Sequence, residues 1–231
     1  MNNDLIANQS GSTNQGVAMT ILDAPARSDV PARSEVPVAV ALDPAGKPAR
    51  PYRLHGTVLS VGALMWAAAI ALYGADPSDS AVGAMVFGIG SGAFQIGLLF
   101  LLRVLRRTDA LGSGKGARRV LVVENVFVGL AIASTIADAV RISDLSQPGW
   151  LLLDAFWPIS MIGMFGLAIR IAIAGRWQGV SRFWPLVAES WAVCVIPTMN
   201  IFGPQVAGIV AVIHLLIGYC TLGQIVARKS E

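Results

Sequence analysis

The stretch RVLVVENVFVGLAIASTIADAV, residues 119–140, decides the fold class of this protein. It is apolar over a length close to the ~20 residues that a helix needs to cross a hydrocarbon core of ~30 Å. Only two acids, Glu124 and Asp138, interrupt it. Within lipid the backbone must satisfy its own hydrogen bonds, so the stretch predicts a transmembrane helix.

Five further apolar stretches of similar length lie on either side of this one. Between them are turn-forming segments such as residues 112–116 and the dipeptide Gly203-Pro204. Hydrophobic residues make up 55% of the chain and charged residues only 13%, against about a quarter charged in soluble proteins. The sequence therefore predicts an all-α polytopic membrane protein, a bundle of six transmembrane helices, rather than a soluble enzyme. The predicted spans are 54–74, 81–102, 119–140, 150–171, 184–201 and 204–226.

The first 53 residues differ in composition from the spans. They contain many prolines and a tandem repeat, PARSDV at 25–30 followed by PARSEV at 31–36. Regular prolines block helix formation, and alternating charges leave little surface to bury. We therefore divide the chain into a disordered cytoplasmic tail (1–53), a transmembrane domain (54–226) and a short cytoplasmic tail (227–231). A docking motif that folds on a partner is an alternative for the first tail.

The basic residues divide unequally between the two sides of the predicted bundle. Sixteen of the 17 Lys and Arg residues fall in the tails and in the second and fourth loops, and Arg141 alone falls on the other side. By the positive-inside rule both termini are cytoplasmic. The preference for Arg over Lys, with abundant Ala, Val and Gly, indicates a bacterial protein of the cytoplasmic membrane.

Polar residues inside a bilayer are the first place to look for function, because each is costly unless it faces protein or water. In the third span Glu124, Thr135 and Asp138 share one helical face, which makes them candidates for lining a pathway. The alternative is structural: Glu124 lies near the positive end of its helix, and Asp138 pairs with Arg141 three residues later.

Later spans add Asp154, Glu189 and His214 to the candidates. One hypothesis makes His214 a proton relay between an outer acid and an inner one. The alternative is a neutral imidazole bonded to a carbonyl or hydroxyl group. For Glu189 the alternative is a place in the first turn of a helix that starts near Pro185, where the helix dipole favours a carboxylate.

The sequence contains no metal-binding, nucleophile or dinucleotide motif, so we expect no cofactor, no metal and no nucleic acid. Cys194 and Cys220 are expected to be small core residues. The lipid bilayer is the expected partner, together with other membrane proteins or a second copy that would dock on small-residue helix faces.

Three functional hypotheses follow. The first is a non-enzymatic accessory or structural membrane protein, whose polar residues should be locally satisfied. The second is a small transporter or proton-coupled permease that uses the intramembrane carboxylates and His214. The third is a membrane enzyme acting on lipid-borne substrates. Convergence of Glu124, Glu189 and His214 on one internal cavity would favour the second, whereas positions far apart or facing lipid would exclude it.

Overall fold

The computed structural model describes residues 51–77 and 80–229, which form helices and no strand. The all-helical prediction is therefore confirmed for this part of the chain. The predicted tail of residues 1–53 lies almost entirely outside it. The helices are α1 (Arg53–Tyr73), α2 (Ala81–Arg107), α3 (Lys115–Ala139), α4 (Pro148–Ala174), α5 (Val180–Glu189), α6 (Trp191–His214), the π-helix η1 (Leu215–Cys220) and α7 (Thr221–Ala227).

Five helical segments are long and apolar enough to cross a membrane, by length and composition. The first four correspond to predicted spans, with ends that differ by a few residues. The fifth is a single segment over 180–227 and contains both remaining predicted spans. The predicted count of six separate helices is thus not found, because the chain stays helical on both sides of a sharp bend.

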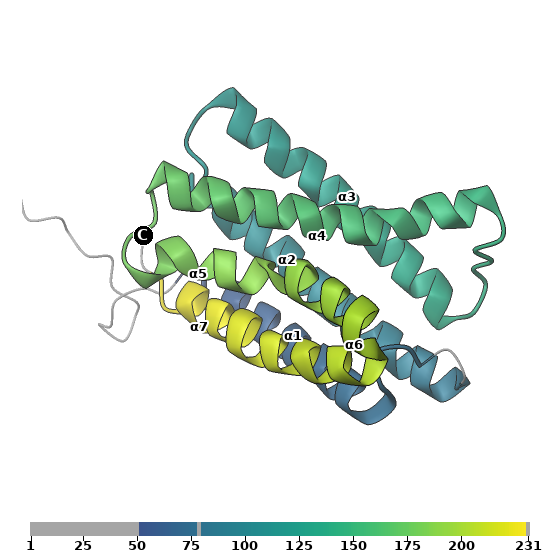
Figure 1. Ribbon diagram of the computed structural model, residues 1–231. Helices are drawn as coiled ribbons and strands as arrows, with labels where there is room; N and C mark the ends of the chain where they lie inside the picture. The colour runs from purple at the N-terminus through teal and green to yellow at the C-terminus, as the bar shows by residue number, and fades with distance from the viewer. Residues whose placement is uncertain (1–50, 78–79, 230–231) are drawn as a thin grey trace, which may run out of the picture. The chain divides into compact units, whose positions relative to one another are not determined.

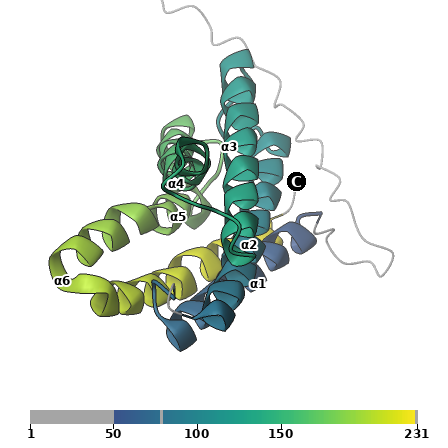
Figure 2. The ribbon, with the colours of Figure 1, turned by 90° about the vertical axis from the view of Figure 1, so that its right-hand side faces the viewer.

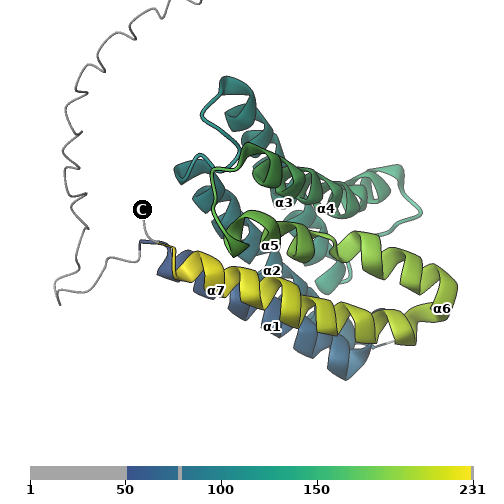
Figure 3. The ribbon, with the colours of Figure 1, turned by 60° about the vertical axis from the view of Figure 1, so that its left-hand side comes forward.

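That bend lies at Gly203 inside α6. Its φ of 83° and ψ of 174° are not helical, and Pro204 follows it. A positive φ of this kind is readily adopted only by glycine. Figure 3 shows α6 turning back at this point, so that its second half, with η1 and α7, runs along α1. A second break separates α5 from α6 at Ser190.

The helices pack as a closed ring. Each of α1 to α4 packs against the next, α4 packs against α5, and η1 and α7 close the ring against α5 and α1. We call the end with Arg53, residues 108–114 and Ala227 the basal end, and the end with residues 140–147 and Gly203 the distal end. Figure 1 shows the basal end on the left, and Figure 2 views the bundle from the distal end.

Glycines allow close contact between α1 and its two neighbours. A Cβ at Gly62 of α1 would lie 2.5 Å from the carbonyl oxygen of Ala93 in α2, and one at Gly223 of α7 would lie 2.5 Å from that of Gly56 in α1. Small residues are the usual means of bringing transmembrane helices together. Ser60 then adds a polar contact, because its hydroxyl donates to the carbonyl of Cys220 at 2.9 Å.

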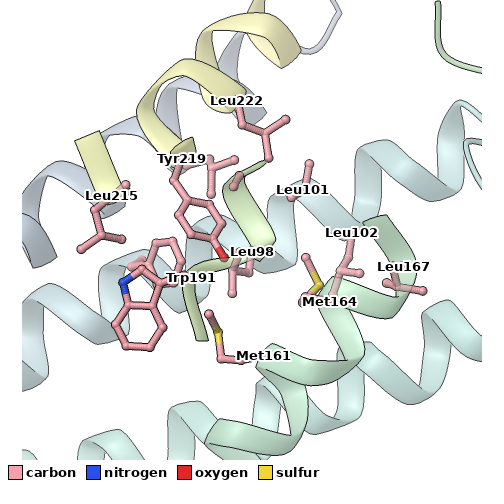
Figure 4. Close-up of a cluster of buried hydrophobic side chains, with 14 of the residues drawn as sticks. Leu98, Leu101, Leu102, Met161, Met164, Leu167, Trp191, Leu215, Tyr219 and Leu222 are labelled. Atoms are coloured by element: carbon pink, nitrogen blue, oxygen red, sulfur yellow. The ribbon is translucent and has the colours of Figure 1, made fainter. Parts of the chain in front are cut away.

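The interior of the ring is filled by large apolar side chains. Figure 4 shows leucines of α2, Met161 and Met164 of α4, Trp191 of α6 and Tyr219 of η1 meeting at the centre. The outward faces of the same helices are apolar as well: Ile162 is 67% exposed and Ile201 is 71% exposed. An apolar surface of this extent is unusual for a protein in water and is compatible with contact to a lipid bilayer.

Candidate functional site

A cavity of about 700 Å³ opens at the distal end, among α1, α2, α3, α4 and α6. We call it the distal cavity. Three of the predicted site residues, Thr135, Asp138 and Asp154, lie on its wall. Ser91 and Arg141 add further polar groups. A cavity of this size, lined by apolar surface and a few polar groups, has the dimensions of a small-molecule site.

The two aspartates of the distal cavity are close enough to interact electrostatically. Asp154 also accepts a hydrogen bond from the hydroxyl of Ser134, at 3.4 Å. The predicted ion pair between Asp138 and Arg141 is not found among the described residues. Instead the backbone N–H of Arg141 donates to the carbonyl of Asp138 at 3.0 Å. Arg141 has a φ of 59°, so the chain turns here and the helical i+3 register assumed for the pair is lost.

Thr135 is bound to a second buried polar side chain, Gln95 of α2. The Gln95 amide nitrogen lies 2.9 Å from the Thr135 hydroxyl oxygen, and that hydroxyl lies 3.2 Å from the amide oxygen. Both side chains are buried, so this contact joins α2 to α3 with little exposure to solvent. Gln95 was not among the predicted site residues.

Aromatic rings form the inner wall of the distal cavity. Trp66 and Trp191 lie with ring centroids 5.1 Å apart, and Trp157 meets both of them edge-on. On the side away from the cavity Phe94 stacks on Trp66 at 5.0 Å and contacts Tyr219 at 4.7 Å. A continuous series of rings therefore leads from the cavity into the centre of the bundle.

Glu189 lies where this series of rings ends. It is 1% exposed, and its Oε2 accepts a hydrogen bond from the Tyr219 hydroxyl at 2.7 Å, whereas Oε1 has no partner. The prediction that Glu189 lies in the first turn of a helix is wrong. The helix begins at Val180 and continues through Pro185, which places Glu189 at its last residue.

Glu124 lies near Glu189, on the other side of the interior. It is 3% exposed, its Oε1 has no partner, and its carboxyl faces Gly163 of α4. The Glu124 charge reaches Glu189, where its effect is smaller than that of burial. The structural alternative, a Glu124 stabilised by the positive end of its helix, is not supported. The helix begins at Lys115, so Glu124 lies beyond its first turn, and no cation of the described residues pairs with it.

His214 directly precedes the π-helix η1, and its Nε2 lies 3.0 Å from the carbonyl oxygen of Ala188. A carbonyl only accepts hydrogen bonds, so Nε2 must carry the proton of this bond. Two further bonds join the same segments: the Trp184 indole to the Gly218 carbonyl, and Tyr219 to Glu189. Three hydrogen bonds thus join the residues before the break between α5 and α6 to the region of the π-helix. A π-helix is a distortion found frequently at functional sites.

The predicted site residues therefore form two groups. Thr135, Asp138 and Asp154 lie on the distal cavity, whereas Glu124 and Glu189 are buried deeper in the bundle and His214 bonds to the carbonyl of Ala188, the residue before Glu189. Glu189 borders a void of about 10 Å³, the room of a single water molecule. The rings of Trp66 and Phe94 lie between the two groups.

Sequence reasoning missed Gln95 and Tyr219, although a signal for both exists. Each is a polar group within an apolar span, and the argument that selected the acids applies to them equally. Nothing in the sequence distinguishes Trp66 from an ordinary core tryptophan. Among residues 51–77 and 80–229 no cluster of three or more His, Cys, Asp or Glu residues has the arrangement to hold a metal ion.

The fold and this site define a multi-pass helical membrane protein with buried carboxyls behind a cavity. No protein family model, curated protein or solved structure matches the chain.

Proposed function

We propose that this protein is a small proton-coupled carrier. A solute enters the distal cavity, and the Glu124 and Glu189 carboxyls exchange the coupled proton. The observation that supports this best is the continuous series of rings from the cavity wall at Trp66, through Phe94, to Tyr219 and its hydrogen bond with Glu189. This series of side-chain contacts connects the distal cavity, where the solute would bind, to the Glu189 carboxyl.

The state of the carboxyls supports a proton-binding role. A buried carboxylate is costly unless a cation or a proton neutralises it, and the cost grows when a second carboxylate lies near. No Lys or Arg of the described residues is paired with Glu124 or Glu189. Each carboxyl has one oxygen without a partner. Two acids of this kind form a site where a proton is the available neutralising group.

The accessory-protein hypothesis fits less well. It requires locally satisfied polar residues, but one oxygen of each carboxyl, Glu124 and Glu189, and the indole nitrogens of Trp66 and Trp191 lack a partner. Some small residues expected to receive a partner are also used within the bundle, since Gly88 packs against Ala139 of α3. The enzyme hypothesis requires two or more of the polar groups at one interface. Asp138 and Asp154 share the distal cavity, but that hypothesis gives no role to the buried Glu124 and Glu189.

Coupling between the two sites would proceed through Tyr219. While its hydroxyl donates to Glu189, its ring supports Phe94 and, through Phe94, Trp66. A change in the proton held by Glu189 alters that hydrogen bond and therefore the position of the rings. The break at Ser190 and the π-helix are where the backbone already departs from α-helical geometry, so they are the hinges for this movement.

The proposed topology has six crossings, with the bend at Gly203 separating the last two. Both termini lie in the cytoplasm, since 16 of 17 cations then fall on that side. The distal cavity consequently opens to the outside of a bacterial cytoplasmic membrane. A solute entering from outside meets the Asp138 and Asp154 carboxyls before it reaches the rings.

Proton flux in proteoliposomes tests this proposal. Vesicles that contain the full-length protein and a pH-sensitive dye are given an inside-negative potassium diffusion potential. They are then challenged separately with amines, carboxylates and neutral sugars. At least one solute class should drive proton movement. Glu189→Gln should reduce the rate by about tenfold or more, equivalent to ~1.4 kcal/mol in the barrier.

Asp144→Asn is the matched control, because it removes one carboxylate from an exposed part of the distal loop. It should retain the wild-type rate. The proposal fails if no solute class moves protons, or if Glu189→Gln and Asp144→Asn transport at the same rate.

A further inference from the structure

A second large cavity lies between α2 and α3 near the basal end, separate from the site described above. Its volume is about 980 Å³. Four arginines lie around it, and its remaining wall is mostly apolar. Figure 1 shows α3 standing apart from the other helices at this end, beyond the loop that joins it to α2. The arginines are Arg103, Arg106, Arg107 and Arg118.

The arginines follow from helix periodicity. Arg103, Arg106 and Arg107 are spaced i, i+3 and i+4 along α2, so they share one face of that helix. Arg118 lies in the first turns of α3, with Val122 one turn further on. On both α2 and α3, therefore, the arginines lie at the basal end of the cavity and the apolar side chains lie further along the helix.

The positive charge of this cavity is not neutralised within the described residues. Asp109 is the one carboxylate on its wall, and none of the four guanidinium groups forms an ion pair. All four arginine side chains are exposed. Guanidinium groups bind phosphate through paired N–H donors, and several around one cavity suit a group of concentrated negative charge.

The apolar wall decides which phosphate compound fits. Leu99 and Phe100 of α2 face Val122 and Val126 of α3 across the cavity. Val122 and Val126 are 52% and 54% exposed, so the protein leaves this apolar surface uncovered. A free phosphate ion would contact only the arginines. A phospholipid would fill both parts, with its phosphate among the arginines and its acyl chains along the apolar wall.

We propose that this cavity binds the phosphate headgroup of an anionic phospholipid from the surrounding leaflet. The lipid fills the space between α2 and α3 and neutralises the arginines. It also supports α3, whose other face presents Glu124 to the interior. The lipid site does not depend on transport, since it shares no residue with the distal cavity or with the carboxyl pair.

The test uses the full-length protein purified in detergent and mixed with phosphatidylglycerol, phosphatidylcholine or inorganic phosphate. Native mass spectrometry counts the retained lipids, and thermal unfolding measures stabilisation. Phosphatidylglycerol should be retained and should raise the unfolding temperature, whereas the other two should do neither. Arg106→Gln with Arg118→Gln should weaken phosphatidylglycerol binding about 30-fold, from two contacts of about 1 kcal/mol each.

Two controls make the result specific to the cavity. Arg176→Gln with Arg228→Gln removes the same charge from exposed basal positions outside the cavity and should leave binding unchanged. Arg106→Lys with Arg118→Lys keeps the charge and should retain most of the binding, which separates loss of a phosphate partner from misfolding.

Three outcomes would overturn the proposal. The first is equal binding of phosphatidylcholine and phosphatidylglycerol. The second is equal loss of binding in the cavity variant and in the Arg176 and Arg228 control. The third is full stabilisation by inorganic phosphate that also displaces the lipid, which would make the arginines a site for the free ion.

Discussion

Gly163 of α4 faces the Glu124 carboxyl so closely that a Cβ at this position would collide with Oε2. Gly166, three residues further along the same helix, has no such neighbour within 4 Å. An alanine at either position adds a methyl group to α4, but only an alanine at position 163 also meets the Glu124 carboxyl.

We predict that Gly163→Ala displaces the Glu124 carboxyl and reduces proton flux in proteoliposomes by about tenfold, or ~1.4 kcal/mol in the barrier. The free energy of unfolding should fall by no more than about 1–3 kcal/mol, because a flexible side chain can rotate away from the added methyl. Gly166→Ala should keep the wild-type flux. Equal fluxes in the two variants would show that the position of Glu124 does not matter.

At the scale of the elements, the contact between α1 and α7 rests on two facing glycines. A Cβ on Gly223 would meet the Ser60 hydroxyl and the Gly56 carbonyl. The Gly56 carbonyl belongs to the backbone of α1, so it cannot rotate away from an added methyl group as a side chain can, and the two helices would have to move apart. We predict that Gly223→Ala lowers the free energy of unfolding by about 1–3 kcal/mol.

Gly129→Ala in α3 is the control for this substitution, since nothing lies within 4 Å of the position. Alanine is the better helix former by up to ~1 kcal/mol, so this variant should be as stable as the wild type or more so. Thermal unfolding in one detergent compares them. A Gly223→Ala variant as stable as Gly129→Ala would contradict the close packing of α1 and α7.

The turn before α4 holds a carboxylate that responds to pH. Hydrogen bonds from the Ser146 hydroxyl, the Gln147 amide and the Ser146 backbone hold the pKa of Asp144 below its usual range. A lowered pKa means that folding favours the charged form. The stabilisation is therefore present at neutral pH and disappears as the pH falls through the lowered pKa.

We predict that Ser146→Ala raises the pKa of Asp144 toward its ordinary value, because it removes the hydrogen bond with the largest effect. Carboxyl carbon NMR during an acid titration measures this pKa directly. Ser143→Ala, in the same loop, should leave it unchanged. An unaltered pKa in Ser146→Ala would show that the turn does not hold the carboxylate as the structure describes.

At the scale of the whole molecule, the 48-residue apolar segment determines on which side the chain ends. In the proposed topology the reversal at Gly203 makes the segment cross twice, which puts both termini on one side of the membrane. We predict that a cysteine at Gln205 reacts with a membrane-impermeant maleimide added outside intact cells, whereas one at Ser113 does not. Cys194 and Cys220 are first replaced by serine.

Ser143→Cys provides the positive control for this labelling, since the 140–147 loop belongs to the same distal end. Labelling at Ser113 but not at Gln205 would reverse the proposed orientation. Labelling at neither position from outside, with a reactive Ser143→Cys, would place the bend within the membrane and contradict six crossings.

The membrane class and the boundaries of the first four long helices were predictable because they depend on local properties. The length of an apolar stretch and the turn residues at its ends can be identified without the rest of the chain. Residues 119–140 are therefore enough by themselves to predict a transmembrane helix. The turn at Gly203-Pro204 was predictable for the same reason. The sequence did not predict that the residues on both sides of it stay helical and form one long segment with this bend.

The candidate site was predictable only as a set of residue types. The cost of a polar group in lipid is a property of the residue, so the sequence by itself was enough to select Glu124, Asp138, Asp154, Glu189 and His214 as candidates. Whether these groups meet depends on how the helices are arranged in the ring. Only the tertiary structure decided that two of the acids share a cavity while the two glutamates share the interior. The sequence could not predict this grouping, because it depends on contacts between residues of helices that are far apart in the chain.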